Sequence, residues 1–131
     1  MFFCNEAPKE QVKISSKISG NRIEVIDFHS THRCMTCNAI ESNTKFTLEK
    51  FFPNELEKGK ISFQVINVDD ERNAKLAEKF SASGTSLFLN VIANGKEKQI
   101  DLTNFAFQKG GDQESFSQEL KLKLETEISN L

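Results

Sequence analysis

The sequence has no Trp, no Tyr, no long hydrophobic run and no basic cluster. A helix that crosses a membrane needs about 20 consecutive apolar residues, and no stretch of this chain approaches that length. Binding of nucleic acid needs concentrated Lys and Arg, whereas here 17 basic residues are set against 19 acidic ones, for a formal net charge of −2. These absences argue against a membrane-spanning protein and against nucleic acid as a partner.

The composition predicts one soluble globular domain. A chain of 131 residues is long enough to bury a single core, and 37% hydrophobic with 27% charged residues is typical of such a protein. The twelve Phe are interpreted as packing residues of that core. The first residues are polar and include Pro8, so we expect a flexible N-terminal arm over residues 1–20 and a folded domain over 21–131.

Three cysteines exclude a fully paired disulfide framework within one chain. Cys34 and Cys37 form a C-x-x-C motif directly after an apolar run and ahead of a segment that can be helical. The free N–H groups and positive dipole end of a helix favour a thiolate at Cys34. Cys37 follows about one turn later, close enough to close a disulfide. The motif therefore indicates thiol chemistry.

The apolar patterns predict the element order β-α-β-α-β-β-α. Residues 23–28 and 61–68 are expected to be parallel strands joined through a helix over 38–52 that Pro53 ends or kinks. Asp69 or Asp70 caps a short helix that reaches Phe80. Residues 87–93 and 96–102 form a hairpin around Asn94-Gly95, and a final helix follows residues 110–112.

This order, with C-x-x-C at the start of the first helix, resembles the thioredoxin fold over about residues 21–130. Further matches are the stretches 25–28 (VIDF), 66–69 (INVD) and 84–89 (GTSLFL). The resemblance implies an α/β protein whose central mixed sheet is flanked by helices. It also implies a thiol:disulfide oxidoreductase or redox carrier that acts on protein thiols and disulfides and needs no cofactor.

The local sequence 28–37 (FHSTHRCMTC), with Ile40 and Glu41, resembles a bacterial thioredoxin-like group labelled as a nitrophenyl compound nitroreductase subunit. The chain has no flavin-binding pattern, so this label is taken as a name only.

Two features depart from the thioredoxin pattern. Thioredoxins place a cis proline at the start of the third strand, where this chain has Thr85 followed by Ser86. A cis bond before a residue other than proline costs about 3 kcal/mol, so we predict a trans bond and a differently shaped loop. In the family, that proline loop presents its backbone to the substrate and keeps metals away from the cysteines.

The second departure concerns Asp27, the candidate for the buried Asp that helps move protons for the second cysteine in thioredoxins. The segment from Asp27 to Cys34 is one residue longer than in thioredoxins. If the extra residue lies in the loop, Asp27 keeps its facing; if it lies in the strand, the side chain turns to the opposite face of the sheet.

In the redox interpretation, Cys34 is the exposed nucleophile and Cys37 resolves the mixed disulfide. Arg33, His32 and the helix N-terminus are expected to lower the pKa of Cys34, and Thr85 and Ser86 to border the site.

Two alternatives stay open. In a metal-binding protein, His32, Cys34 and Cys37 would hold copper or zinc, while His29, on the strand, points away. In a non-catalytic interaction subunit, the thiols would be incidental.

Cys4, preceded by two Phe and followed by a polar tract, is a candidate lipid-anchored residue of a cell-envelope protein. The chain lacks the small residue expected just before such a cysteine, and the alternative is a cytoplasmic protein with a spare thiol in a disordered tail.

Overall fold

The computed structural model describes residues 20–131, so Cys4 and all but the last residue of the predicted arm lie outside the described residues. The strands are β1 (Arg22–His29), β2 (Ile61–Asn67), β3 (Ser86–Ala93) and β4 (Lys96–Asp101). The helices are α2 (Met35–Phe51), α3 (Pro53–Lys58), α4 (Ala74–Lys79), α5 (Thr103–Lys109) and α6 (Gln113–Ser129), with a 3₁₀ turn η2 (Glu71–Asn73) before α4.

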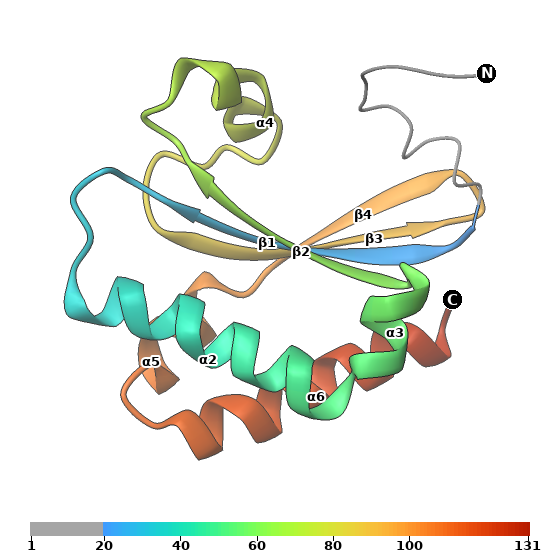
Figure 1. The fold of residues 1–131 in the computed structure, drawn as a ribbon. Helices are drawn as coiled ribbons and strands as arrows, with labels where there is room; N and C mark the ends of the chain where they lie inside the picture. The colour runs from blue at the N-terminus through green and yellow to red at the C-terminus, as the bar shows by residue number, and fades with distance from the viewer. Residues whose placement is uncertain (1–19) are drawn as a thin grey trace.

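The four strands form one mixed sheet in the order β2-β1-β3-β4. β1 pairs in parallel with β2 and antiparallel with β3, and β3 pairs antiparallel with β4. Helices α2, α3, α5 and α6 cover one face of the sheet, and α4 lies on the other (Figure 1). The predicted parallel β-α-β unit and the α/β class with a mixed central sheet are confirmed.

Each face of the sheet has its own core because side chains alternate along the strands. On the α2 side, Ile23 and Val25 of β1 pack with residues of α2 and α6 that include Leu48 and Leu120. On the α4 side, Phe28, Phe80 and Phe88 form an aromatic cluster with ring centroids 5.2 to 6.0 Å apart.

Among residues 20–131, no helix has the length and the apolar composition that a membrane-spanning segment needs.

The first helix begins earlier than predicted. α2 starts at Met35 rather than at residue 38, because Cys34 adopts an extended backbone and its sulfur accepts the N–H of Cys37 as an N-cap. Pro53 both ends α2 and occupies the first turn of α3, where its missing N–H costs nothing. The sequence patterns predicted neither α3 nor α5, since each is too short to show a helical period.

The predicted hairpin turn is confirmed. Asn94 and Gly95 both have positive φ, 55° and 80°, as a two-residue turn between antiparallel strands requires.

The start of α2 is held against the turn between α5 and α6. The carbonyl of Gly110 accepts a hydrogen bond of 3.1 Å from the Asn43 side chain, and both residues are buried. A Cβ on Gly110 would lie 2.9 Å from Thr36 Cγ2 and 3.0 Å from the carbonyl oxygen of Ala106. A side chain at position 110 would therefore force Thr36 or the Ala106 carbonyl to move, so the small size of Gly110 supports the close packing of this turn against the helix that carries Cys37.

We expect Gly110→Ala to lower the free energy of unfolding by roughly 1–3 kcal/mol, because the added methyl group meets a backbone oxygen and a branched side chain. Urea denaturation followed by circular dichroism measures the effect. Gly111→Ala is the matched control, since a Cβ there meets nothing within 4 Å. Equal midpoints for the two variants would show that Gly110 does not set the helix position.

Candidate functional site

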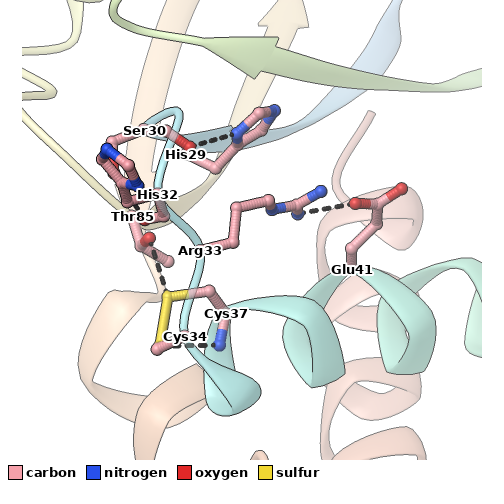
Figure 2. The surroundings of a disulfide bond; sticks show 8 residues. All are labelled: His29, Ser30, His32, Arg33, Cys34, Cys37, Glu41 and Thr85. Carbon is pink, nitrogen blue, oxygen red and sulfur yellow. Dashed lines mark hydrogen bonds and ion pairs between the residues drawn. A yellow bond between two sulfur atoms is a disulfide. The ribbon is translucent and has the colours of Figure 1, made fainter.

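Cys34 and Cys37 are joined by a disulfide at the N-terminus of α2 (Figure 2). Their Cα atoms are 5.0 Å apart, and the Cys37 N–H lies 3.1 Å from Cys34 Sγ. The first turn of α2 contains no acidic residue. Because a helix N-terminus carries partial positive charge and free N–H donors, a thiolate at Cys34 is stabilised when the disulfide is reduced.

The two cysteines have different surroundings. Cys34 is exposed, whereas Cys37 is only 6% exposed. The Thr85 hydroxyl, which directly precedes β3, donates a hydrogen bond of 3.1 Å to Cys37 Sγ (Figure 2). An attacking thiol can therefore reach Cys34 far more easily than Cys37.

Thr85 contacts the motif through its hydrogen bond to Cys37, whereas the Ser86 hydroxyl donates to the carbonyl of Gly84 at 3.2 Å. Ser86 is the first residue of β3, and it pairs with Phe28 of β1. No peptide bond among residues 20–131 is cis, so the prediction of a trans Thr85–Ser86 bond is confirmed.

The loop between β1 and Cys34 is held by residues at the end of β2 and just after it. The Thr31 N–H donates to Asp69 Oδ2 at 2.8 Å, and Asn67 Nδ2 donates to the Thr31 hydroxyl at 3.3 Å. The backbone and side-chain hydrogen bonds of Thr31 lower the pKa of Asp69. Asp69 was expected only as a possible helix cap. Its position at the carboxyl end of a strand parallel to β1 was the signal that it would meet this loop.

Neither histidine contacts the sulfur atoms through a hydrogen bond described for residues 20–131. His29 Nδ1 is hydrogen-bonded to the Ser30 carbonyl at 2.8 Å, and His32 is exposed. Within the same residues, no group of three or more His, Cys, Asp or Glu side chains is arranged to hold a metal ion. The structure therefore does not assemble His32, Cys34 and Cys37 into a ligand set.

Arg33 is paired with Glu41 of α2 rather than directed at the cysteines. Its Nη2 lies 2.6 Å from Glu41 Oε1, and Figure 2 shows the side chain extending away from the disulfide. The positive charge next to Cys34 in the sequence is thus shared with a carboxylate. The sequence does not reveal this pair, because no simple spacing rule links a loop residue to a helix residue eight positions later.

Asp27 lies on β1 and is completely buried, with no hydrogen-bond partner for either carboxylate oxygen. It alternates with Ile23 and Val25, so it faces the α2 side of the sheet, and the extra residue before Cys34 lies in the loop. Burial raises the pKa of Asp27 to about 7; Arg33 lowers it, and Glu41 raises it by a smaller amount.

No protein-family model and no curated protein matches the sequence. Among solved structures, the chain is similar to the Trx4 domain of ERdj5, with 16% identity over 82% of this chain and 83% of that one and a TM-score of 0.53. Fasciola hepatica thioredoxin is 19% identical over 73% of this chain and 86% of its own, with a TM-score of 0.47. Mitochondrial thioredoxin 3 from Saccharomyces cerevisiae is also 19% identical, over 75% and 84%, with a TM-score of 0.47.

The fold is thioredoxin-like. The disulfide-bonded C-x-x-C pair lies at the start of the first helix of this thioredoxin-like domain, as the sequence predicted. No finding supports the narrower likeness to a nitroreductase subunit.

Asp27 of the thioredoxin-like domain makes stability depend on pH. A carboxyl whose pKa is higher in the folded than in the unfolded protein destabilises the fold once it must ionise. The destabilisation is absent below about pH 4, grows as the pH rises, and is complete above about pH 7. The difference between about 7 and the usual 3.8 corresponds to about 4 kcal/mol.

We therefore expect Asp27→Asn to raise the free energy of unfolding relative to the native chain by several kcal/mol more at pH 8 than at pH 4. Urea denaturation of the oxidised proteins at pH 4, 6 and 8 measures this. The acid measurement is the internal reference, since at pH 4 the folded protein holds Asp27 protonated and the unfolded chain ionises it only in part, so little of the destabilisation is present. A difference between the two proteins that does not vary with pH would show that Asp27 ionises normally.

Proposed function

We propose that this protein is a thiol:disulfide oxidoreductase or redox carrier that exchanges electrons with protein substrates through Cys34 and Cys37. The observation that carries the proposal is the disulfide between an exposed N-cap cysteine and a buried partner. The nitroreductase label contributes no chemistry to it. Neither the metal-binding nor the interaction alternative has a specific observation in its favour among residues 20–131.

In the reducing direction, the Cys34 thiolate attacks one sulfur of a substrate disulfide. A mixed disulfide forms, and the other substrate sulfur leaves as a thiolate. Cys37 then loses its proton and attacks Cys34 Sγ, which releases the second substrate thiolate and gives the Cys34–Cys37 disulfide. Two electrons pass from the dithiol to the substrate, and the oxidising direction reverses these steps.

Each step has support in the geometry. The helix N-terminus stabilises the attacking thiolate of Cys34, and the Thr85 hydroxyl donates to the sulfur of Cys37. The resemblance to thioredoxins implies that Asp27 accepts the proton of Cys37. A buried carboxyl whose pKa is about 7 is matched to that task near neutral pH.

The two cysteines should give opposite results in a trapping experiment. We expect Cys37→Ser to accumulate a mixed disulfide with native insulin, because the Cys34 thiolate still attacks an insulin disulfide but nothing resolves the product. Cys34→Ser should accumulate at least tenfold less, since Cys37 is buried. Non-reducing electrophoresis and mass spectrometry identify the linked cysteine. Trapping mainly through Cys37 would contradict the assigned roles.

We also propose, from the sequence around Cys4, a lipid-anchored protein of the cell envelope, a compartment in which disulfides persist. Expression of the chain with its native upstream sequence should place it in the detergent phase after Triton X-114 partition. Cys4→Ala should move it to the aqueous phase. A native protein found wholly in the aqueous cytosolic fraction would end this proposal and favour the cytoplasmic alternative.

A further inference from the structure

The ion pair between Arg33 and Glu41 acts electrostatically on the buried Asp27 and has no part in the thiol exchange described above. Arg33 leaves the loop just before Cys34, and Glu41 lies on α2 four residues after Cys37. Residues four apart share one side of a helix, so Glu41 and Cys37 lie one above the other. Asp27 faces the same α2 side of the sheet.

Two oppositely charged groups in this region have unsatisfied polar atoms. Both carboxylate oxygens of Asp27 and the Nε and Nη2 atoms of Arg33 are buried without a hydrogen-bond partner, although Nη2 lies within ion-pair distance of Glu41. A forked Arg–carboxylate pair would satisfy them together and is among the strongest pairings in proteins. Arg33 instead binds Glu41, whose side chain is 34% exposed.

We propose that Glu41 is a positioning residue: by binding Arg33, it holds the guanidinium away from Asp27 and leaves the Asp27 carboxyl free to take and return the proton of Cys37. The inference rests on the proposed function. An Asp27 carboxylate held by Arg33 would remain ionised at neutral pH and would be a poor proton acceptor.

The charges around Asp27 agree with this arrangement. The residues opposite it on β2 and β3 are Val65 and Leu87, both apolar. The charged groups that act on it are Arg33 from the loop and Glu41 from α2, and the two act in opposite directions. The cysteines of α2 are uncharged in the disulfide.

Two neutral substitutions test the proposal, because their effects should have opposite signs. Glu41→Gln releases Arg33 toward Asp27 and should lower the pKa of Asp27 by about one unit, a tenfold change in its ionisation ratio. Arg33→Gln removes the opposing charge and should raise that pKa. NMR titration of the Asp27 carboxyl carbon in the oxidised full chain measures both.

Glu49→Gln is the matched control. It makes the same charge change on the same helix, at an exposed position, and should leave the pKa of Asp27 unchanged. Glu41→Asp, which keeps the charge, should restore part of the native value. In stopped-flow measurements, the rise with pH in the rate of mixed-disulfide resolution should shift to lower pH in Glu41→Gln and to higher pH in Arg33→Gln.

The titration does not depend on catalysis, so the two proposals fail separately. Positioning through Arg33 requires that the shift caused by Glu41→Gln be largely lost in the Arg33→Gln background, and that result in a protein that cannot reduce insulin would uphold the role of Glu41 and overturn the oxidoreductase function. A Glu41→Gln shift of the same size in both backgrounds would show that Glu41 acts on Asp27 by its charge alone and would overturn the positioning role. Active variants whose Asp27 pKa values stay unchanged, or shift in the same direction, would overturn the positioning role and leave the function intact. If Glu41→Gln does not fold, Glu41→Ala is compared in the native and Arg33→Gln backgrounds in the same way.

Discussion

The pairing of β1 on both edges determines where the functional residues lie. With β2 on one side and β3 on the other, β1 cannot shift its register, and each of its residues is committed to one face of the sheet. Asp27 is therefore held among apolar neighbours on the α2 side, although its carboxyl finds no hydrogen bond there. The strand also delivers the chain to Cys34 at the sheet edge where the loops of β1 and β2 meet.

The side chains of the site differ in exposure, hydrogen bonding and pKa, and these differences suit them to different steps. Cys34 is exposed and caps the N-terminus of α2, whereas Cys37 is buried and accepts a hydrogen bond from the Thr85 hydroxyl. Burial raises the pKa of the Asp27 carboxyl to about 7, so its neutral and charged forms are both populated near neutral pH. Separating an attacking group from a resolving group is what allows one pair of sulfurs to perform two successive displacements.

Most of the fold could be predicted because the strands and α6 have a clear period and the hairpin has a specific turn sequence. The cysteine pair was visible for the same reason, since its spacing fits one helical turn. The short helices α3 and α5 show no such period. Which face of the sheet the Asp27 side chain occupies depended on whether a single extra residue lay in the strand or in the loop. The partners of Arg33 and Thr31 come from other segments of the fold, and spacing along the chain does not reveal them.

The backbone around the cysteine motif is supported on both sides, by the turn that packs against α2 and by the residue that binds the preceding loop. Gly110 and Asn43 hold the helix from behind, and Asp69 holds the loop ahead of Cys34. We therefore expect that opening or closing the disulfide needs little more than rotation of the two cysteine side chains. On that expectation the surface around the motif has nearly the same shape in both states, and a partner would distinguish them by the sulfur atoms themselves.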